Sequence, residues 1–312
     1  MIAASPIVVT GASGLLGANL TLELAARGHH VVALYGRHRI AVAGTASAAC
    51  DLTDSGATAR LLSAWVPSLI VHCAAATNVD WCESHPQEAM RINAQAAGEL
   101  AAHARSAGAG FVYISTDAVF DGVSGGYVET DPVSPGNWYA RSKLAGEEAV
   151  LRAMPEALVL RVNIFGWNLQ AKNSLAEWIL LRLEQGVPVP GFCDTAFAPV
   201  LVNDTADWIT RLAASGCRGI YHVASADHGS KYEFARETAA VFHLDASLVR
   251  ETLVQESSLS APRPRNTWLR TDKIAAELGQ SMPTIRQGLE NFHALREDGF
   301  CQRLKAAGLA EE

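Results

Sequence analysis

Tyr139 and Lys143 stand four residues apart in the stretch Tyr-Ala-Arg-Ser-Lys, a spacing with a chemical use. On a helix, the two side chains lie on one face. A tyrosine has an ordinary pKa of about 10 and is a poor acid at neutral pH, but a neighbouring ammonium favours the phenolate and lowers that pKa. We therefore expect Tyr139 to act as a proton donor, although the same spacing is also common in helix surface pairs that do no chemistry.

A hydroxyl group for the same reaction comes from Ser115–Asp117, which ends a predicted strand. Open α/β sheets bind ligands at the carboxyl ends of their strands, so Thr116 is expected to hold the carbonyl oxygen of a substrate. Thr116, Tyr139 and Lys143 together could orient a ketone, protonate its oxygen as hydride arrives and stabilise the alkoxide. Asn93, on the preceding predicted helix, either braces that helix or holds a water, and a capping or packing role explains it equally well.

Three glycines, Gly11, Gly14 and Gly17, follow a predicted strand and open a predicted helix in the stretch Thr-Gly-Ala-Ser-Gly-Leu-Leu-Gly. Their missing side chains let the backbone turn sharply and approach a pyrophosphate, whose charge the helix N-terminus stabilises. Glycines at this spacing also mark ordinary tight turns, but the strand, turn and helix setting favours dinucleotide binding.

The residues after the second predicted strand distinguish between the two nicotinamide dinucleotides. Folds that prefer NAD place an acid there for the ribose 2′-hydroxyl, whereas this chain has Arg37 and Arg39. An arginine pairs with a 2′-phosphate in bidentate fashion, so NADP(H) is expected, with NAD(H) as the alternative and a solvated surface arginine as the other interpretation. Asp51 and Leu52, after a third strand, are expected near the adenine. The predicted cofactor contacts are Gly11, Ser13, Gly14, Leu15, Leu16, Gly17, Arg37, Asp51, Leu52, Ala74, Ala75, Ala76, Asn93, Tyr139 and Lys143.

A parallel sheet must position these residues, because short β-branched runs alternate with longer alanine- and leucine-rich stretches in the first half of the chain. The predicted helices are Leu15–Arg27, Pro86–Ala107 and Tyr139–Met154. Right-handed crossovers would place them on both faces of a doubly wound, Rossmann-type α/β sheet. The predicted strands are Ile7–Thr10, Val31–Leu34, Leu69–His72, Phe111–Ser115, Leu158–Val162 and Gly219–Val223.

The alternation weakens after about Phe165, which predicts a smaller C-terminal substrate-binding lobe. Gly186–Pro199 contains several Pro and Gly residues and is predicted to be irregular. Thr271–Arg296 is predicted to form two short helices split at Pro283. The predicted division assigns residues 1–166 and about 197–223 to the Rossmann domain, and about 167–196 and 224–312 to the lobe.

The composition excludes several classes of function. A net charge of -7 and a pI near 5.8 leave no concentrated basic surface, so nucleic acid is not an expected partner. No window approaches the roughly 20 apolar residues that span a bilayer, and the first residues lack a basic leader, so we expect no membrane partner and a cytoplasmic location. The six cysteines form no CxxC pair and the histidines no HExxH motif, so neither disulfides nor a metal site is expected.

The order of motifs along nearly the whole chain resembles the extended short-chain dehydrogenase/reductase family. These motifs are GASGLLG, HCAAAT, RINA, STDAVFDG, YARSK and RPRN. Within that family, STDAVFDG, the TNVD at Thr77–Asp80 and the RPRNTWL that begins at Arg263 are most similar to dTDP-4-dehydrorhamnose reductases and related sugar-nucleotide reductases.

The resemblance implies that Thr116, Tyr139 and Lys143 are the catalytic residues, the last two also at the nicotinamide ribose. It implies that Arg263 is a diphosphate partner, and it places Trp167 at the substrate, although a core position under the lobe is the alternative for this aromatic side chain. The positions implied near the nicotinamide are Val162 and Asn163, and the implied substrate contacts are Thr77, Val79, Asp117, Trp167 and Arg263.

The function that the resemblance implies is an NADPH-dependent reductase of a 4-keto nucleotide sugar, with hydride from the nicotinamide and a proton from Tyr139. An epimerase that keeps its cofactor bound would use the same residues. Ala118 stands where sugar-nucleotide 4,6-dehydratases carry a glutamate, so dehydration is disfavoured. Leu15 and Leu16 stand where the reductases have glutamine and leucine, which is more similar to the beta subunit of methionine adenosyltransferase. A non-catalytic NADP-binding regulatory subunit is therefore a further alternative, and a homodimer is an open expectation.

Overall fold

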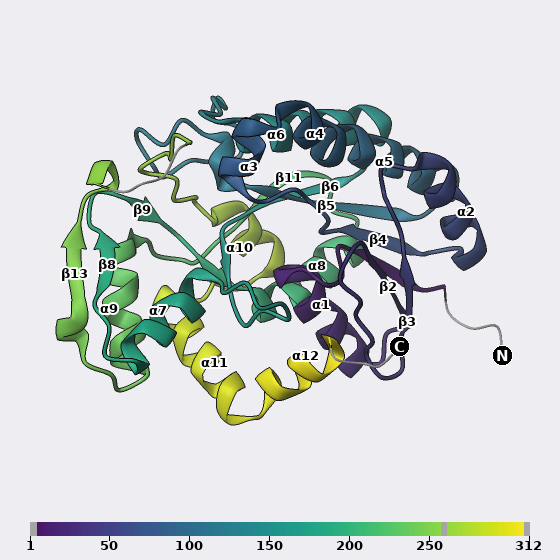
Figure 1. Ribbon diagram of the computed structural model, residues 1–312. Coiled ribbons are helices and arrows are strands. Elements are labelled where there is room, and N and C mark those ends of the chain that lie inside the picture. Colours follow the sequence, from purple (N-terminus) through teal and green to yellow (C-terminus); the bar gives the residue numbers. More distant parts are fainter. Residues whose placement is uncertain (1–4, 257–260, 309–312) are drawn as a thin grey trace.

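The computed structural model describes residues 5–256 and 261–308, and its centre is a sheet of seven parallel strands (Figure 1). The strand order is β3-β2-β1-β4-β5-β6-β11, so the chain moves outward from β1 and then crosses to the other side at β4. This is the Rossmann order, with a switch point between β1 and β4, and the expected doubly wound α/β fold is confirmed. The strands are β1 Ile7–Thr10, β2 Val31–Tyr35, β3 Ala46–Ala49, β4 Leu69–His72, β5 Gly110–Thr116, β6 Leu158–Val162 and β11 Gly219–Val223.

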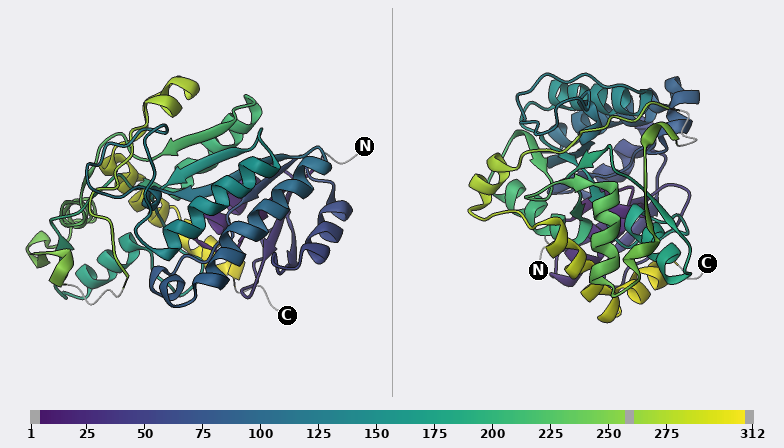
Figure 2. Two further views of the ribbon diagram at one scale, coloured as in Figure 1. Left: turned by 90° about the horizontal axis from the view of Figure 1, so that it is seen from above. Right: turned by 90° about the vertical axis from the view of Figure 1, so that its left-hand side faces the viewer.

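Helices cover both faces of this sheet (Figure 2). Along β1, Val9 belongs to a core cluster that includes α1 and α8, whereas Val8 belongs to a second cluster with α2, α5 and α6. Successive side chains of a strand point to opposite faces, and both faces are buried here, which is why the strands are nearly continuous apolar runs. The helices are α1 Leu15–Ala26, α2 Ser55–Trp65, α4 Pro86–Met90, α5 Ala96–Ser106, α6 Trp138–Ala153 and α8 Val202–Ala214.

The sequence pattern located most of the sheet but gave no bounds for β3. The six strands whose bounds were predicted are confirmed to within one residue at each end. β3 has the sequence Ala-Ser-Ala-Ala and lies at the sheet edge beside β2, so its small residues carry no β-branched signal. The predicted helix Pro86–Ala107 is confirmed in extent, but its middle segment, η1 Arg91–Gln95, is a π-helical turn.

A smaller group of elements lies to one side of the sheet (Figure 1, left). It comprises α7 Leu175–Glu184, α9 Lys231–Val241, α11 Ile285–Glu297 and the parallel strand pair β8 Val189–Phe192 and β13 Val249–Thr252. Their apolar side chains form a third core cluster, and each of the three helices starts with a capping box. The prediction that Gly186–Pro199 is irregular is wrong in part. β8 and β9 Ala196–Phe197 lie within this range, and each pairs with a distant segment.

The last helices return to the Rossmann core. α10 Asp272–Leu278 and α11 confirm the two helices predicted around Pro283, whereas α12 Phe300–Gly308 was not predicted. Ile274 of α10 and Leu304 of α12 belong to the first core cluster, together with α1. The division of the chain into a Rossmann domain and a lobe stays a prediction. The remaining short elements are α3 Val79–Ser84, η2 Asp117–Val119, β7 Ile164–Phe165, β10 Val200–Leu201, β12 Gly229–Ser230, η3 Ala246–Leu248 and η4 Val254–Glu256.

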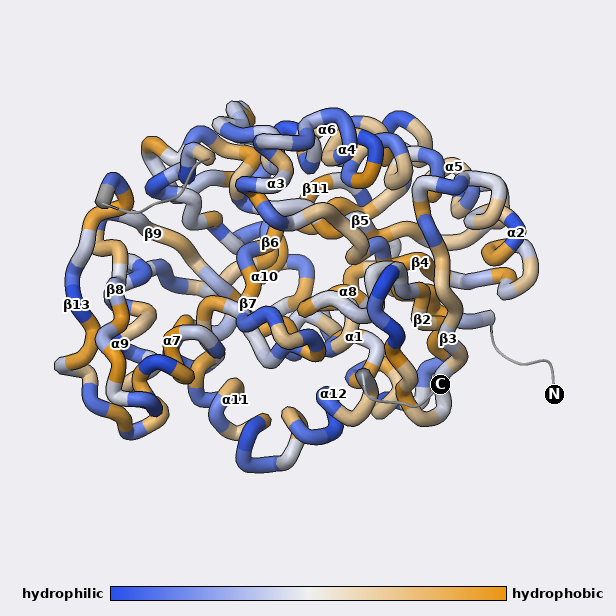
Figure 3. The backbone as a smooth tube through the Cα atoms, viewed as in Figure 1, coloured by the Kyte–Doolittle hydropathy of each residue, from blue (hydrophilic) through white to orange (hydrophobic). Residues whose placement is uncertain are grey.

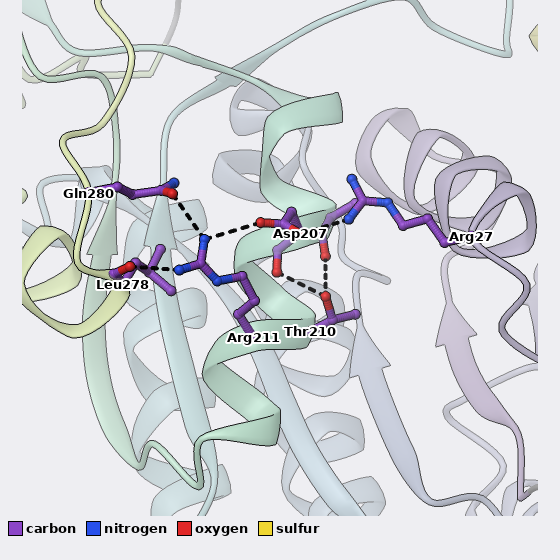
Figure 4. Close-up of polar contacts among 7 residues, drawn as sticks. Arg27, Asp207, Thr210, Arg211, Leu278 and Gln280 are labelled. Atoms are coloured by element: carbon purple, nitrogen blue, oxygen red, sulfur yellow. Dashed lines mark hydrogen bonds and ion pairs between the residues drawn. The ribbon is translucent and has the colours of Figure 1, made fainter.

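Polar contacts of α8 connect it to both neighbouring helices (Figure 4). Asp207 accepts from Arg27, which follows α1, at 2.8 Å. Arg211 donates to the carbonyl oxygen of Leu278 in α10 at 2.6 Å and to Gln280 Oε1 at 3.0 Å. The Arg27–Asp207 pair is about 40% exposed on each side, so it contributes little to stability. Together these bonds connect α8 to the end of α1 on one side and to the end of α10 on the other.

Hydrophobic residues concentrate in the central strands, while the outer surface of helices such as α6 carries many hydrophilic residues (Figure 3). Within residues 5–256 and 261–308, no helix has both the length and the apolar character needed to cross a membrane.

Candidate active site

Two cavities adjoin across the carboxyl ends of the central strands. The central cavity, of about 590 Å³, is lined by the glycine turn, the ends of β5 and β6 and the start of α6. The outer cavity, of about 650 Å³, is lined by the ends of β2 and β3 and by η1. Gly11, Ala74 and Ala75 line both cavities, so the two meet at the switch point between β1 and β4. A doubly wound sheet binds its ligands at this position.

Most predicted site residues lie at these cavities. Those that line one or both are Gly11, Ser13, Gly14, Leu15, Leu16, Gly17, Arg37, Asp51, Leu52, Ala74, Ala75, Thr77, Thr116, Asp117, Tyr139, Lys143, Val162 and Asn163. The predicted residues that are not among the lining residues of either cavity are Ala76, Val79, Asn93, Trp167 and Arg263.

In the glycine turn, the backbone packs so closely that two positions leave no room for a side chain. Gly11 has a φ of 61°, and a Cβ on it would lie 2.6 Å from the backbone of Ala74. A Cβ on Gly17 would lie 2.2 Å from the carbonyl oxygen of Gly11. Among the described residues, no side chain caps the start of α1, and its first turn contains no acid. The first N–H groups of α1 are therefore left for an anion in the central cavity.

The outer cavity carries two arginines, Arg37 after β2 and Arg91 on η1. Arg91 Nη2 donates to the hydroxyl oxygen of Thr53 at 3.1 Å, and that hydroxyl donates to Asp51 at 2.7 Å. The hydrogen bonds from Thr53 lower the pKa of Asp51, whose carboxylate is thus already engaged. Two guanidinium groups suit a phosphate. Sequence reasoning missed Arg91, although it opens the same Arg-Ile-Asn-Ala motif as Asn93.

The three predicted catalytic residues meet in the central cavity: Thr116 at the end of β5, and Tyr139 and Lys143 on the first turns of α6. The Lys143 side chain is 2% exposed, and its ammonium donates to the carbonyl oxygen of Ile114 at 2.7 Å. It also lies 4.0 Å from the centre of the Tyr113 ring. The lysine is thus anchored on β5, beneath the cavity.

Burial is the largest cause of the pKa shifts of Lys143 and Tyr139. It lowers the pKa of Lys143 from 10.5 to about 7, against a smaller opposing effect of Glu147. It raises the pKa of Tyr139 from 10.0 to about 12, although a hydrogen bond with Thr116 acts in the other direction. The expected lowering of the Tyr139 pKa by Lys143 is therefore wrong for this structure, because burial disfavours the charged phenolate and is the largest cause of the shift.

A buried ion pair lies under the catalytic residues. Glu147, one helical turn beyond Lys143, accepts from Arg161 Nη2 at 2.8 Å and from the Ser115 hydroxyl at 2.5 Å. Both charged side chains are nearly inaccessible to solvent. Ser115 also lines the central cavity, but its hydroxyl donates to Glu147, whereas Thr116 is the residue whose side chain hydrogen-bonds with Tyr139. Sequence reasoning missed this pair, although an arginine inside the apolar run of β6 was a signal for it.

Asn93 braces the chain that follows β4. Its Oδ1 accepts from the backbone N–H of Ala76 at 2.7 Å, and its Nδ2 donates to the carbonyl oxygen of Ala76 at 3.0 Å and to Ser142 at 2.9 Å. The side chain is fully buried, and the π-helical turn of η1 contains it. Of the roles open to Asn93 from the sequence, these bonds favour the packing role, in which the side chain fixes the backbone of Ala76.

Asp117 ties three segments together at the edge of the central cavity. Its Oδ2 accepts from Asn163 Nδ2 at 2.7 Å and from the hydroxyl of Thr267 at 2.6 Å. Its Oδ1 accepts from the hydroxyl of Thr116 at 3.1 Å. Burial raises the pKa of Asp117, while the three hydrogen bonds act to lower it. The carboxyl group therefore positions Thr116 and Asn163.

The residues expected at the substrate divide into two groups. Arg263 pairs with Asp80 of the TNVD segment at 3.0 Å, which brings two distant motifs together beside the central cavity residue Thr77. Trp167 instead stacks on Phe292 of α11 with ring centres 4.0 Å apart and donates its indole N–H to the Phe292 carbonyl oxygen. Trp167 thus takes the core position that was its alternative interpretation.

Comparisons with known proteins agree with this architecture. A family model described as the RmlD substrate binding domain matches residues 5–296. The chain is 34% identical over 303 residues to the probable low-salt glycan biosynthesis reductase Agl14 of Haloferax volcanii, an alignment that covers 93% of this chain and 98% of that protein. It is 34% identical over 278 residues to methionine adenosyltransferase 2 subunit beta of Danio rerio, covering 86% of this chain and 83% of that protein.

A solved structure of dTDP-4-dehydrorhamnose reductase from Bacillus anthracis, in complex with NADP, superposes with a TM-score of 0.83 at 27% identity and covers 93% of this chain and 99% of that chain. The resemblance expected from the motifs is thereby confirmed. The chain belongs to the RmlD substrate binding domain family, and with it to the extended short-chain dehydrogenase/reductases, a superfamily of NAD(P)-dependent oxidoreductases.

Proposed function

We propose that this protein is an NADPH-dependent reductase of a 4-keto nucleotide sugar. The observation that carries the proposal is the meeting of Thr116, Tyr139 and Lys143 with the glycine turn in one cavity. Support also comes from the relatives, among which are the Agl14 reductase and the B. anthracis dTDP-4-dehydrorhamnose reductase crystallised with NADP.

The residues of the two cavities fit a phosphorylated dinucleotide. The uncapped N-terminus of α1 and the glycine turn would hold its pyrophosphate. Arg37 and Arg91 in the outer cavity would hold the 2′-phosphate, which favours NADP(H) over NAD(H). Val162 and Asn163 would lie at the nicotinamide. When bound, the reduced nicotinamide supplies the hydride for the ketone.

The protein's own groups handle the oxygen of the ketone. The hydroxyl of Tyr139 would hold this oxygen, and that of Thr116 would join it by turning away from Asp117, to which it donates in the structure. Tyr139 would then donate its proton as the alkoxide develops. A proton on Lys143 stabilises the phenolate left behind, and a pKa of about 7 lets this lysine take up and release a proton near neutral pH. Reduction consumes one hydride and one proton for each ketone converted to an alcohol.

The nucleotide sugar would enter beside Thr77 and Asp117. Arg263 and Val79 lie on the two segments that meet at the Arg263–Asp80 pair, and Arg263 is our proposed diphosphate partner. We do not assign Trp167 to the substrate, because its indole N–H and ring face are engaged by Phe292.

The test is NADPH oxidation by the purified protein with a panel of 4-keto nucleotide sugars that differ in their nucleotide. At least one member should be reduced, and Tyr139→Phe should lower kcat about 100-fold or more without weakening NADPH binding. Tyr232→Phe, on α9, is the matched control and should leave kcat unchanged. Tight NADPH binding without turnover of any panel member, unchanged by Tyr139→Phe, would contradict the proposal.

A non-catalytic subunit is the second candidate, because the chain is 34% identical to methionine adenosyltransferase 2 subunit beta of Danio rerio as well as to Agl14. This candidate predicts a stoichiometric complex with a methionine adenosyltransferase catalytic chain in gel filtration. Turnover of NADPH with a keto sugar and no such complex would exclude it. A homodimer and a cytoplasmic location stay predictions.

A further inference from the structure

A segment that the motifs did not single out lies against the glycine turn. This segment, Asn168–Ser174, is called the covering loop here. Gln170 Nε2 donates to the carbonyl oxygen of Ser13 at 2.8 Å, so the loop contacts the turn directly. Gln170, Lys172 and Asn173 line the central cavity together with Gly11–Gly17. The loop therefore faces the position at which an anion would meet the start of α1.

Hydrogen bonds hold the covering loop in one shape. Asn168 donates its backbone N–H to Glu177 at 3.0 Å and its Nδ2 to the carbonyl oxygen of Lys172 at 2.7 Å. Ser174 donates its hydroxyl to the carbonyl oxygen of Gly166 at 2.7 Å, and Glu177 accepts its N–H at 2.8 Å. Both ends of the loop are thus fixed to the N-terminus of α7 before any ligand arrives.

Lys305 of α12 stabilises the covering loop through hydrogen bonds to its backbone. Its ammonium donates to the carbonyl oxygens of Asn168 at 2.6 Å, Gln170 at 3.2 Å and Leu169 at 3.4 Å. An ammonium has three donors, so these three carbonyls satisfy it. Leu169 is buried in the first core cluster with Leu304 of α12. Lys305 itself is not among the residues that line the central cavity.

Charge indicates what the loop could bind. A helix N-terminus supplies only about half a positive charge, whereas a pyrophosphate carries about two negative charges. The central cavity has two lysines among its described lining residues, and one of them, Lys143, is held by the carbonyl oxygen of Ile114. The other is Lys172, on the covering loop.

We propose that the covering loop is a preformed clamp on the pyrophosphate of the dinucleotide, in which Lys172 supplies the ammonium and Lys305 is a positioning residue that acts through the loop. The inference rests on the cofactor site of the proposed function. A nucleotide sugar also contains a diphosphate, and the contact of Gln170 with Ser13 favours the cofactor, because the glycine turn is the cofactor's phosphate site.

The experiment measures the dissociation constant of NADPH by fluorescence titration, at low and high salt. Lys172→Met should weaken binding about tenfold at low salt, and less at high salt, because screening weakens the lost interaction. Lys172→Arg should bind within about threefold of the wild type. Lys305→Met should weaken NADPH binding about threefold to tenfold by loosening the loop. Lys273→Met is the matched control, since this exposed lysine also donates to a backbone carbonyl, that of Ile220, at 2.6 Å.

Two further ligands separate this clamp from a general loss of structure and from a substrate contact. Adenosine 2′-monophosphate reaches only the outer cavity, so its affinity should stay the same in Lys172→Met and Lys305→Met. The KM of the nucleotide sugar should also stay the same. A lowered affinity for the sugar nucleotide with unchanged NADPH binding would overturn the proposal in favour of a substrate clamp.

Unchanged NADPH affinity in Lys172→Met would overturn the inference and leave the proposed function intact. A wild-type protein that does not bind NADPH would overturn both. Should Lys305→Met fail to fold, Lys172→Met still decides the question, because Lys172 is exposed.

Discussion

Replacing Lys143 by methionine should stabilise the fold at neutral pH while it abolishes turnover. Burial lowers the pKa of this lysine from 10.5 to about 7. These pKa values differ by about 3.5, and each unit corresponds to about 1.4 kcal/mol, so the charge costs the folded protein up to about 5 kcal/mol. Loss of the hydrogen bond to the Ile114 carbonyl offsets about 1–3 kcal/mol of this. We expect the variant to be about 2–4 kcal/mol more stable at pH 6.

The pH dependence has a definite sign. Below pH 7 the lysine is protonated in both states, and the full cost of the buried charge is present. Between pH 7 and pH 10.5 the unfolded chain binds a proton here that the folded chain does not, so the stability of the wild type rises with pH. The advantage of the variant should therefore shrink across this window. The titratable neighbours that interact with Lys143, which are His72, Cys73 and Glu147, are common to both proteins.

The assay is urea unfolding of both proteins at pH 6, 8 and 10 without cofactor. Lys172→Met, which removes an exposed lysine side chain, should change the unfolding free energy by about 0.5 kcal/mol or less at each pH. A Lys143→Met variant that is less stable than the wild type at pH 6, or whose stability difference does not vary with pH, would refute the reasoning.

Three further substitutions test the support of the site. Glu147→Ala should lower the unfolding free energy by about 3–5 kcal/mol, because it leaves the Arg161 guanidinium buried without its carboxylate, and the double variant Glu147→Met with Arg161→Met should recover most of this loss in urea unfolding. Gly17→Ala should weaken NADPH binding more than about tenfold in a fluorescence titration, since its Cβ would lie 2.2 Å from the Gly11 carbonyl oxygen; unchanged binding would contradict the role of the turn. Asn93→Ala should cost about 1–3 kcal/mol in thermal or urea unfolding, because the backbone N–H and carbonyl of Ala76 lose their partners, and a neutral effect would show that water replaces them.

The parts of the fold that local pattern determines could be predicted from the sequence. The buried strands are apolar runs, and the glycine turn is a contiguous motif whose strand and helix neighbours give it meaning. β3 is different, because its small residues belong to a strand only through pairing with β2. Likewise, β8 depends on β13, which lies about 60 residues further along the chain.

In the candidate site, too, features within one element could be predicted, whereas contacts between distant segments could not. Tyr139 and Lys143 share a helix, so their spacing predicted that they would meet. The contacts of Lys305 with the covering loop join residues that are more than 130 positions apart, and no local pattern indicates them. The pKa of Tyr139 was misjudged for a related reason, because its burial depends on the packing of the whole site.

The most direct test of the central claim follows the hydrogen that is transferred. The protein is incubated with NADPH that carries deuterium at both C4 hydrogens of the nicotinamide and with the 4-keto nucleotide sugar that it reduces fastest. The product is examined by NMR and mass spectrometry. The reductase account predicts one deuterium at C4 of the sugar in the wild type and almost no product with Tyr139→Phe. A product without deuterium, formed while the cofactor stays reduced, would contradict it.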